Sequence, residues 1–512
     1  MREEQWKLEE INELLLRSRI VSRSDQGGIV FRGVETDSRK VNEGDLFICL
    51  PGTTMDGHEF AAIAVEQGAV ALVVTRELPL AVPQLLVPDC REAQAWIANY
   101  CYQSPSKEMR VIGVTGTNGK TTTTYLLEHL LQHSGKETGL MGTIRISYAG
   151  KTETAVNTTM DALSLQRTLR EMKSAGCSHV AMEVSSHGLA LGRVKGVRFS
   201  TAVFTNLTQD HLDFHVTMDD YRDSKALLFA RMDNSLGANM QEVQTAVLNA
   251  DDPATVTFAR LTSAQVLTYG VKDATAHLRA VNISYHLGGT TFTLTSYLGD
   301  RLVNTKMFGL FNVYNVLAAL ATGLAERLDL DEMIAGLDSV NGVDGRFEPV
   351  RAGQPFLAVV DYAHTPDGLE NVLQTARTLT EGRVICLFGC GGDRDRTKRP
   401  KMARIACQWS DVVIATSDNP RSEDPEMILD DVFTGIVYAP QEGALAKQVE
   451  RIADRAEAIE RAISLAEAGD VVLIAGKGHE TYQIIKGVTH SFDDRVQARR
   501  ALHKRGFEEA NA

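Results

Sequence analysis

The segment of residues 116–122 combines glycines, a lysine and hydroxyl side chains in an order that suits phosphate binding. Its sequence is Gly-Thr-Asn-Gly-Lys-Thr-Thr, and it stands between a predicted strand, Arg110–Thr115, and a predicted helix, Lys120–His133. A glycine-rich turn between a strand and a helix N-terminus directs backbone N–H groups and the positive end of the helix dipole at phosphate oxygens. We therefore expect Lys120 to reach the terminal phosphates of a nucleotide and the Thr121 hydroxyl to complete the coordination of Mg²⁺.

This loop is a variant of the general pattern G-x-x-x-x-G-K-[ST], which places its first glycine at position 114. The chain has Val114 there, between Gly113 and Gly116. Because the strand–turn–helix context that such a loop requires is present, a phosphate-binding loop is favoured over a chance Gly-Lys-Thr turn.

Two further polar segments follow predicted strands. Glu183 lies in Met-Glu-Val-Ser-Ser-His-Gly, residues 182–188, and His211 ends Phe-Thr-Asn-Leu-Thr-Gln-Asp-His, residues 204–211. Because ligands gather at the carboxyl ends of the strands in an open α/β sheet, we expect both side chains to project toward the phosphate loop. A carboxylate is a hard oxygen ligand that suits Mg²⁺, and a neutral imidazole is an acceptable partner.

Strands and helices in a regular order are needed to position these groups, and the apolar pattern predicts them. In the middle of the chain, short apolar runs predict strands at Val180–Val184, Thr201–Thr205 and Thr245–Asn249. A later block begins near Arg346 and predicts strands at Phe356–Val360, Val384–Phe388, Val412–Ala415 and Val471–Ile474. Short apolar strands separated by helices indicate parallel, doubly wound sheets. The stretch Ala280–Thr305, rich in Thr and Val around a Gly-Gly turn, instead predicts an antiparallel hairpin.

A length of 512 residues predicts several domains, at roughly 100–200 residues each. Near the N-terminus, apolar residues follow helical spacing at Trp6, Leu8, Ile11, Leu14 and Leu15, and apolar segments such as Val70–Val74 then alternate with turns. We predict an α/β protein of three domains. They are an N-terminal α/β module over residues 1–108, a central P-loop ATPase-like doubly wound sheet over residues 109–343, and a C-terminal Rossmann-like α/β domain over residues 344–512.

The composition is that of a globular protein, because 44% apolar and 23% charged residues argue against disordered, collagen-like and coiled-coil classes. A formal net charge of −13 argues against nucleic acid or an anionic membrane as the main partner. The N-terminal segment lacks a secretory signal and the chain has no run of about 18 apolar residues, so we expect a cytoplasmic protein without membrane insertion. The seven cysteines form no C-x-x-C pair and are interpreted as buried thiols: Cys49, Cys90, Cys101, Cys177, Cys386, Cys390 and Cys407.

The run of residues 116–122 resembles the ATP loop of the Mur ligases, the ATP-dependent amide-bond-forming enzymes that build the peptide stem of bacterial peptidoglycan. Gly-Leu-Phe-Asn-Val-Tyr-Asn at 309–315 and Val-Asp-Tyr-Ala-His-Thr-Pro at 360–366 extend the resemblance. Asp-Gly-Arg at 344–346 departs from the usual Pro-Gly-Arg or Cys-Gly-Arg in its first position only. The resemblance implies that Asn315 lies at the adenine, Arg346 on the phosphates and Asp361 near the ribose. The implied ATP-binding residues are Gly116, Thr117, Asn118, Gly119, Lys120, Thr121, Thr122, Asn315, Arg346 and Asp361.

The resemblance also assigns a role to Lys225, which ends Tyr221-Arg-Asp-Ser-Lys in a predicted helix. The lysine at this place in Mur ligases is carbamylated, which turns a cation into an anionic, carboxylate-like group. A desolvated lysine with a lowered pKa offers the neutral amine that reacts with CO₂. The implied catalytic residues are Lys120, Lys225, Glu183 and His211, and the implied Mg²⁺ ligands are Thr121, Glu183, His211 and Lys225.

Other residues resemble the substrate-binding positions of the tripeptide-forming Mur ligases. Asp-Ser-Arg at 37–39, Gly-Asp-Leu-Phe at 44–47 and Pro-Gly-Thr-Thr-Met-Asp-Gly at 51–57 imply that the first domain binds a uridine nucleotide. The residues implied to hold UDP-N-acetylmuramoyl-L-Ala-D-Glu are Thr36, Ser38, Asn157, Thr158, Thr159, Ser185, Arg193 and carbamylated Lys225. Met160 and Leu191 depart from common versions of these motifs, so no direct contact from position 191 is implied.

A C-terminal loop contains Thr-Ser-Asp-Asn-Pro-Arg at residues 416–421. The Asp-Asn-Pro-Arg run resembles the mark of the Mur ligases that add meso-diaminopimelate, which differs from lysine by a second carboxylate at its far end. A guanidinium binds a carboxylate bidentately, whereas lysine would bring an ammonium group to Arg421 and be repelled. Glu480 would receive the ammonium beside that carboxylate. The implied binding residues are Arg394, Asp418, Asn419, Pro420, Arg421, Gly476 and Glu480.

Together these motifs predict ATP-driven amide formation, in which MgATP phosphorylates the γ-carboxylate of D-Glu and the amine of meso-diaminopimelate then displaces phosphate. We expect a monomer. An L-lysine-adding ligase, a folylpolyglutamate synthetase-like ligase and a P-loop regulator without amide synthesis remain as alternatives. No residue stands out as the general base, although His187, His215, His364 and His479 lie in motif regions.

Overall fold

The computed structural model of the chain describes residues 5–21, 28–52, 55–233, 239, 242–286, 289–438 and 443–508. It contains two compact units, each assembled from several stretches of chain. The first unit consists of Met1–Gly113, Lys136–Ala202 and Ala230–Gln244, and the second of Val114–Gly135, Val203–Phe229 and Thr245–Ala512.

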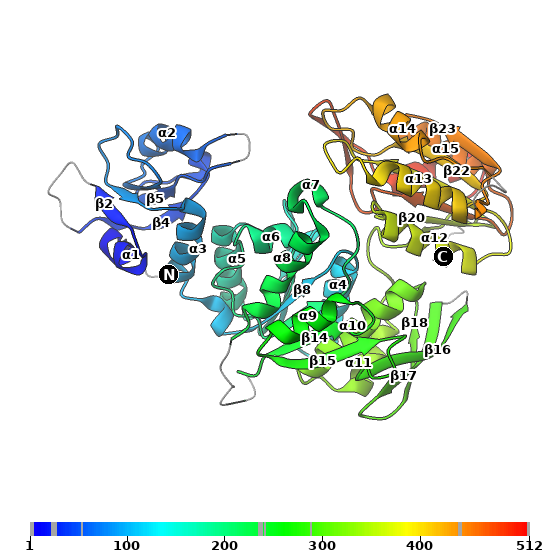
Figure 1. Cartoon of the computed structure of the whole chain (residues 1–512), viewed down its shortest axis with the longest axis horizontal. Helices are drawn as coiled ribbons and strands as arrows, with labels where there is room; N and C mark the ends of the chain where they lie inside the picture. The colour runs from blue at the N-terminus through cyan, green and yellow to red at the C-terminus, as the bar shows by residue number, and fades with distance from the viewer. Residues whose placement is uncertain are drawn as a thin grey trace. The chain divides into compact units, whose positions relative to one another are not determined.

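The N-terminal part of the first unit, drawn in blue in Figure 1, contains a sheet of five strands. Their order is β2-β7-β6-β5-β4. The strands are β2 (Arg19–Val21), β4 (Gly33–Glu35), β5 (Asp45–Ile48), β6 (Ala71–Val74) and β7 (Gln84–Leu86). Strands β4 to β7 pair in parallel, and β2 pairs antiparallel with β7. The helices are α1 (Leu8–Leu14), α2 (Ala61–Glu66) and α3 (Cys90–Cys101), with 3₁₀ turns at Ser38–Lys40, Gly57–Phe60 and Pro105–Lys107. This part of the chain therefore has the predicted α/β character.

The helical prediction at Trp6 is wrong. Trp6 lies in the two-residue strand β1 (Trp6–Lys7), which pairs antiparallel with β3 (Val30–Phe31), and helix α1 begins at Leu8. The rings of Trp6 and Phe31 are 5.7 Å apart across this pair. The backbone of Trp6 thus pairs with strand β3, and its ring packs against Phe31. The spacing of apolar residues near Trp6 carries no information about this distant partner.

The rest of the first unit contains β9 (Thr138–Met141) and β12 (His179–Glu183), which pair in parallel. An antiparallel ribbon of β10 (Arg145–Tyr148) and β11 (Lys151–Thr154) extends from β9. This ribbon was not predicted from the sequence, because all four residues of β11 are exposed and carry no apolar signal. The helices are α5 (Ala162–Ser174) and α6 (Ser186–Ala190).

Strands β8 (Arg110–Thr115) and β13 (Thr201–Phe204) lead from the first unit into the second. Helix α4 (Lys120–His133) follows β8 with the predicted bounds. The next elements are α7 (Leu212–His215), α8 (Met218–Ala230), β14 (Thr245–Asn249), α9 (Ala254–Leu261), β15 (Gln265–Gly270), α10 (Leu310–Ala325) and α11 (Leu330–Leu337). Strand β16 (Leu278–His286) pairs in parallel with β15 and antiparallel with β17 (Gly289–Ser296), which pairs with β18 (Arg301–Thr305). The predicted hairpin is therefore confirmed and has a third strand, while Gly288 of its turn lies outside the described residues.

The C-terminal sheet of the second unit has the strand order β19-β20-β24-β21-β22-β23. Its strands are β19 (Glu348–Val350), β20 (Leu357–Asp361), β21 (Val384–Cys390), β22 (Val412–Ser417), β23 (Gln448–Arg451) and β24 (Val471–Ala475). Only β19 is antiparallel. The helices are α12 (Pro366–Thr378), α13 (Lys398–Trp409), α14 (Pro425–Phe433), α15 (Arg455–Leu465) and α16 (Asp494–Lys504), and β25 (Tyr482–Ile485) with β26 (Val488–Ser491) forms a hairpin.

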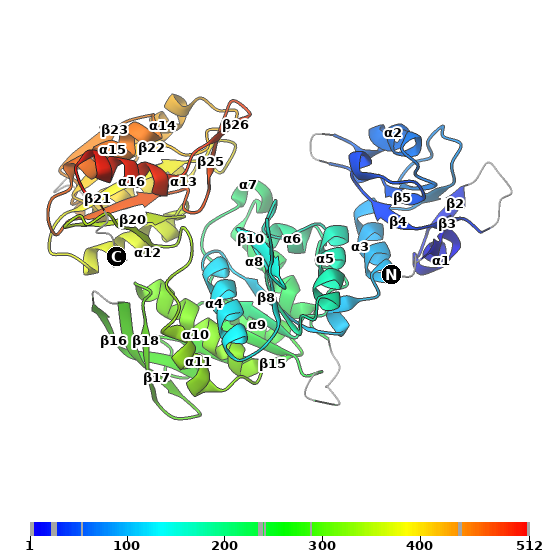
Figure 2. The ribbon, with the colours of Figure 1, turned by 180° about the vertical axis from the view of Figure 1, so that it is seen from behind.

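Alternate residues of these strands enter two different cores. Cys386 and Phe388 pack with α12, α13 and α14, whereas Ile385 and Leu387 pack with α15 and α16. Helices thus cover both faces of the sheet (Figure 1, Figure 2), which confirms the predicted doubly wound, Rossmann-like arrangement.

Two features concern the whole chain. All seven cysteines are free and buried, as predicted. In the stretches that the structure describes, no helix has both the length and the apolar character needed to cross a membrane.

Candidate active site

The phosphate loop joins β8 to α4 and depends on a glycine at position 119. Gly119 has φ +86°, and a Cβ there would lie 2.4 Å from Asn315 Oδ1. Residues with a side chain are strained in this conformation and would also collide with Asn315. Thr121 and Thr122 follow in the first turn of α4, and both are buried.

Two lysines share the backbone carbonyl of Gly116 as an acceptor. Lys120 Nζ donates to the carbonyls of Gly116 and Thr117 at 2.9 and 2.8 Å. Lys225 Nζ, from the predicted helix that the structure shows as α8, donates to the Gly116 carbonyl at 2.8 Å and lies 4.3 Å from the centre of the Tyr221 ring. Burial, and then the charge of Lys120, holds the pKa of Lys225 well below its usual value. Lys225 is therefore the desolvated lysine that the sequence analysis expected.

The segment that follows β13, residues 206–211, holds the phosphate loop in place. Thr208 N donates to Thr117 Oγ1 at 3.0 Å, and that hydroxyl donates to the Thr208 carbonyl at 3.1 Å. Asn118 N donates to Asn206 Oδ1 at 2.9 Å. Only His211 of this segment was predicted as a site residue, because the bonds of the other side chains depend on which loop packs beside them.

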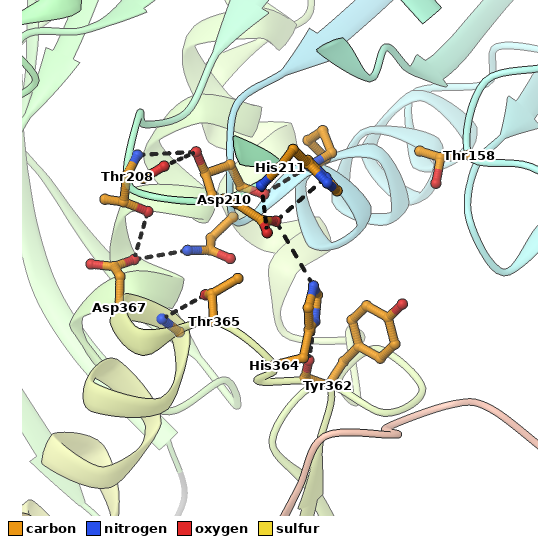
Figure 3. A network of polar contacts seen from close by, with 12 residues as sticks. Thr158, Thr208, Asp210, His211, Tyr362, His364, Thr365 and Asp367 are labelled. Carbon is orange, nitrogen blue, oxygen red and sulfur yellow. Dashed lines mark hydrogen bonds and ion pairs between the residues drawn. The ribbon is translucent and has the colours of Figure 1, made fainter. Parts of the chain in front are cut away.

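Asp210 is a buried carboxylate that sequence reasoning missed. Its Oδ2 lies 3.4 Å from His211 Nε2 and 4.0 Å from His364 Nε2 (Figure 3). Burial opposes its ionisation, but neighbouring basic groups, with His211 the foremost, lower the pKa of Asp210 to about 2. Burial lowers the pKa of His364 to about 4, so that imidazole is neutral at neutral pH. Asp210 is thus an anion that can orient His211.

Asp367, in the first turn of α12, was also missed, and it reaches the phosphate loop. Its Oδ2 accepts from Asn118 Nδ2 at 2.8 Å and from Thr208 Oγ1 at 3.4 Å (Figure 3). Thr365 caps the same helix by accepting from Gly368 N at 3.1 Å. The position of Asp367, directly after the motif at 360–366, is the one sequence signal that could have found it.

Arg346 and Asp361 stand at the start of the C-terminal sheet, where Arg346 precedes β19 and Asp361 ends β20. Arg346 Nη2 donates to Thr121 Oγ1 at 3.0 Å, and its guanidinium lies 4.4 Å from the centre of the Tyr362 ring. Asp361 ends β20 and accepts from the backbone N–H groups of Phe347 and Ala363 at 2.6 and 2.7 Å. Despite these bonds, burial raises the pKa of Asp361 to about 6.

Asn315 stands on α10 with its side chain held from within the helix. Its Nδ2 donates to Asn312 Oδ1 at 3.0 Å, which turns Oδ1 of Asn315 toward Gly119. The structure thus brings together the predicted ATP residues of the loop, Arg346 and Asn315.

Another cluster, in the first unit, surrounds Glu183. Its carboxylate is fully buried at the end of β12 and accepts from Thr143 N at 2.8 Å and from Thr143 Oγ1 at 3.0 Å. Thr143 Oγ1 is also 3.0 Å from Thr158 Oγ1. Thr143 therefore links two predicted site residues, although sequence reasoning did not select it.

Thr159 connects the other members of this cluster. Its Oγ1 donates to the Glu183 carbonyl at 3.1 Å and accepts from Ser185 N at 2.9 Å. Arg193 Nη1 donates to the Thr159 carbonyl at 2.8 Å, and burial lowers the pKa of Arg193. The predicted residues Thr158, Thr159, Ser185 and Arg193 are thus brought together with Glu183.

The remaining predicted residues of the first unit lie at separate positions. Thr36 and Ser38 follow β4, and Ser38 begins a 3₁₀ turn whose N-cap, Asp37, accepts from Arg39 N at 3.1 Å. Asn157 is exposed in the loop after β11. Thr53 and Thr54 of the motif at 51–57 lie outside the described residues.

In the C-terminal sheet, a buried lysine gathers three of the residues predicted to bind meso-diaminopimelate. Lys477 Nζ lies 2.9 Å from Glu480 Oε2, 3.3 Å from Asn419 Oδ1 and 3.7 Å from Asp418 Oδ1. Asn419 Nδ2 donates to the same Glu480 oxygen at 2.8 Å. Burial, and then the charge of Asp418, raises the pKa of Glu480. Sequence reasoning did not select Lys477, although it stands inside the motif that supplied Gly476 and Glu480.

The two predicted arginines lie in loops at the carboxyl ends of β21 and β22. Arg421 adopts φ +54°, and its Nη1 donates to the Gly392 carbonyl at 2.7 Å. Arg394 is exposed and its Nη1 donates to the Asp393 carbonyl at 3.0 Å. Pro420 precedes Arg421 in its loop, and Gly476 directly follows β24 with φ +119°.

The predicted Mg²⁺ ligands are divided between the units, with Glu183 in the first and Thr121, His211 and Lys225 in the second. Within the described ranges, no group of three or more His, Cys, Asp or Glu side chains is arranged to hold a metal ion. The predicted ligand set is not a group of that kind, because only two of its four members, Glu183 and His211, are of those residue types. The other two would be the Thr121 hydroxyl and a carbamylated Lys225, both oxygen donors that suit Mg²⁺.

Comparison with known proteins accounts for these motifs. Residues 30–101 match the catalytic domain described for the Mur ligase family, residues 114–323 match the Mur ligase middle domain, and residues 345–478 match the Mur ligase glutamate ligase domain. A Bacillus cereus protein named UDP-N-acetylmuramoyl-L-alanyl-D-glutamate--2,6-diaminopimelate ligase is 50% identical over 469 residues, 92% of this chain and 93% of the relative.

Two further comparisons agree. A protein of the same name from Geobacillus kaustophilus is 50% identical over 473 residues, 92% of this chain and 95% of the relative. A solved structure of a UDP-N-acetylmuramoyl-L-alanyl-D-glutamate--2,6-diaminopimelate ligase is 37% identical, covers 98% of this chain and 100% of its own, and superposes with a TM-score of 0.67. This chain therefore belongs to the Mur ligase family.

Proposed function

We propose that this protein is an ATP-dependent ligase that adds meso-diaminopimelate to the γ-carboxylate of D-Glu in UDP-N-acetylmuramoyl-L-Ala-D-Glu, a step of peptidoglycan precursor synthesis. The observation that carries the proposal is 50% identity to ligases of that name over more than nine-tenths of both chains. The Asp-Asn-Pro-Arg run at residues 418–421, with its charged neighbours, supports the choice of amino acid.

ATP would bind at the phosphate loop. Lys120 and Arg346 would meet its phosphates, Asn315 its adenine and Asp361 its ribose. The contacts of Arg346 with Thr121 and of Asp367 with Asn118 support this assignment, because they bring groups from outside the loop onto it. In phosphoryl transfer, most of the catalysis comes from positioning the reactants and stabilising charge. The side chains of Lys120 and Arg346 can do both.

Mg²⁺ would be held by Thr121, Glu183, His211 and carbamylated Lys225, and would neutralise charge on the phosphates. The burial of Lys225, whose Nζ donates to the neutral Gly116 carbonyl, supports carbamylation, because carbamylation would replace the ammonium with an anion near Lys120, which donates to the same carbonyl. The carboxylate of Glu183 supports metal binding because it is a buried hard donor.

The muramoyl dipeptide would be bound by Thr36, Ser38, Asn157, Thr158, Thr159, Ser185 and Arg193. Thr159 supports this site because it already joins Ser185, Arg193 and the Glu183 strand in one network. The far carboxylate of meso-diaminopimelate would meet Arg394 and Arg421, and its ammonium would meet Glu480 near Asp418 and Asn419.

The reaction has two steps. A γ-carboxylate oxygen of D-Glu attacks the γ-phosphorus of ATP, and ADP leaves with the bonding electron pair, which gives an acyl phosphate. The free amine of meso-diaminopimelate then attacks the acyl carbon, the C–O bond breaks and phosphate leaves, while the amine loses a proton. Exclusion of water matters because the acyl phosphate hydrolyses easily.

We further propose that the protein acts as a cytoplasmic monomer of three domains with boundaries near residues 108 and 344. The uridine nucleotide would bind the first domain, ATP the second and the amino acid the third.

An assay of ADP release tests the proposal. Purified protein is given MgATP, UDP-N-acetylmuramoyl-L-Ala-D-Glu and either meso-diaminopimelate or L-lysine. We expect release with meso-diaminopimelate and at least 100-fold lower kcat/KM with lysine, the scale of discrimination that a mispaired buried charge supplies. Release with lysine alone would identify the lysine-adding ligase, and release with neither amino acid would contradict the ligase assignment.

A further inference from the structure

Two loops carry the arginines assigned above to the far carboxylate of meso-diaminopimelate. Residues 391–395 follow β21 and include Arg394, and residues 418–424 follow β22 and include Arg421. The loops touch through their backbones, since Gly392 N donates to the Asn419 carbonyl at 2.9 Å. A Cβ at position 392 would lie 1.9 Å from the carbonyl oxygen of Pro420, so only glycine permits this approach.

Arg399, in the first turn of α13, bonds to both loops and is fully buried. Its Nη2 donates to the Gly391 carbonyl at 3.2 Å and to Glu423 Oε1 at 2.8 Å, and its Nη1 donates to Glu423 Oε2 at 3.0 Å. Nη1 also donates to Asp431 Oδ2, on α14, at 2.8 Å. One guanidinium thus joins the first loop, the second loop and the helix that follows the second loop.

Glu423, in the second loop, also bonds to the first loop. Its Oε1 accepts from Asp393 N at 2.6 Å, and the Asp393 carboxylate accepts from Ser422 Oγ at 2.6 Å and from Ser422 N at 3.2 Å. Asp393 has φ +52°, a conformation that costs energy in a non-glycine residue and persists only where neighbours hold it. The residue before Arg394 is therefore held by the same network that begins at Arg399.

We propose that Arg399 is a positioning residue for amino-acid recognition, which holds the loops of Arg394 and Arg421 in register so that both can meet the far carboxylate. The inference rests on the proposed function. Lysine cannot replace Arg399, because the bidentate bond to Glu423 and the bonds to Asp431 and Gly391 use a planar fork of donors that an ammonium lacks.

The test compares Arg399→Lys with Arg396→Lys in the full-length protein. Arg396 is a matched control, because it is an exposed arginine of the same segment that bonds to both oxygens of Asp431, at 3.0 and 3.2 Å. Apparent KM values are measured for meso-diaminopimelate, ATP and the UDP-dipeptide by ADP release. We expect Arg399→Lys to raise KM for meso-diaminopimelate at least ten-fold and the other two KM values less than two-fold, with all three values near wild type for Arg396→Lys.

Each outcome decides the inference. An unchanged KM for meso-diaminopimelate in a variant with the wild-type melting temperature would overturn it, and so would an equal rise of all three KM values, which indicates general loss of structure. If Arg399→Lys does not fold, the same three KM values are measured for Glu423→Gln and judged by the same criteria. This variant removes the negative charge that pairs with Arg399, while the amide oxygen of the new side chain can still accept from Asp393 N. Absence of turnover by the wild-type protein with meso-diaminopimelate would instead refute the proposed function, so the two failures are distinguishable.

Discussion

Burial sets the charge of several single residues around the phosphate loop. The pKa of Lys225 lies well below its usual value, that of His364 falls to about 4, and that of Asp361 rises to about 6. Burial is the largest cause of all three shifts, since a low-dielectric surrounding disfavours the charged form of acids and bases alike. His364 is therefore neutral at neutral pH, whereas Asp361, with a pKa of about 6, is mostly ionised there.

Asp361 makes stability depend on pH in a direction opposite to that of most carboxylates. Because its pKa rises from 3.8 to about 6 on folding, the folded protein keeps a proton that the unfolded chain releases in this window. The resulting stabilisation is complete below about pH 4 and is lost as the pH rises through about 6. The asparagine of Asp361→Asn has no proton to lose, so the variant does not share this loss of stability. The melting temperature of the variant minus that of the wild type should therefore rise between about pH 4 and 6 and stay constant at higher pH. Calorimetry at several pH values measures this difference, and a constant difference would show that Asp361 does not titrate there.

Gly119→Ala should weaken ATP binding as well as stability. The new methyl group would meet Asn315 Oδ1 at 2.4 Å in a backbone conformation with φ +86°. Gly135→Ala is the matched control, because Gly135 has φ +70° at the other end of α4 and a Cβ there meets nothing within 4 Å. Both variants should lose about 1 kcal/mol from backbone strain. Only Gly119→Ala should raise KM for ATP, by roughly ten-fold or more, as expected when a binding loop is displaced. Equal KM values for the two variants would contradict this role of the loop geometry.

At the scale of elements, the N-terminus of α12 acts on the phosphate loop. Its first-turn carboxylate, Asp367, accepts from Asn118 and Thr208, although α12 packs in the C-terminal core. A carboxylate in a first helical turn stabilises the helix, and here it also fixes the side chain of a loop residue. The N-terminus of α12 thus connects the loop to the C-terminal sheet, in addition to the bond from Arg346 to Thr121.

Asp367→Ala should raise KM for ATP by roughly five-fold, the effect of losing one hydrogen bond of about 1 kcal/mol. Glu332→Ala is the control, because it removes an exposed first-turn carboxylate from α11 and with it a comparable interaction with the helix dipole. KM for ATP is measured at saturating concentrations of the other substrates. If both variants behave like wild type, α12 does not position the loop.

At the scale of the whole molecule, apolar packing leaves the thiols inaccessible. All seven cysteines are buried, and burial raises the pKa of Cys49, Cys90, Cys386 and Cys390 to about 12. A thiol reagent such as DTNB needs both access and a thiolate. The native protein should therefore react over hours, whereas the denatured chain should titrate seven thiols at once. Rapid reaction of one equivalent in the native state would place a cysteine at the surface.

Several elements could be predicted from sequence because their signals are local. Strands β8 and β14 and helix α4 have the predicted bounds, since apolar runs between turn residues specify them without reference to distant partners. Trp6 and the β10–β11 ribbon were missed, because their conformation is set by pairing with other strands.

The sequence by itself determined the α/β class, the phosphate loop and the residue types of the candidate site, because motif spacing and hydrophobic period are properties of neighbouring residues. Only the tertiary structure revealed that Asp367 bonds Asn118, that Lys477 joins Asn419 to Glu480, and that Arg399 ties two loops together. Asn118 and Asp367 are 249 positions apart along the chain, Asn419 and Lys477 are 58 apart, and Arg399 and Glu423 are 24 apart. A buried charge is stable only beside its counter-charge, and which residues become neighbours is decided by the packing of the whole fold.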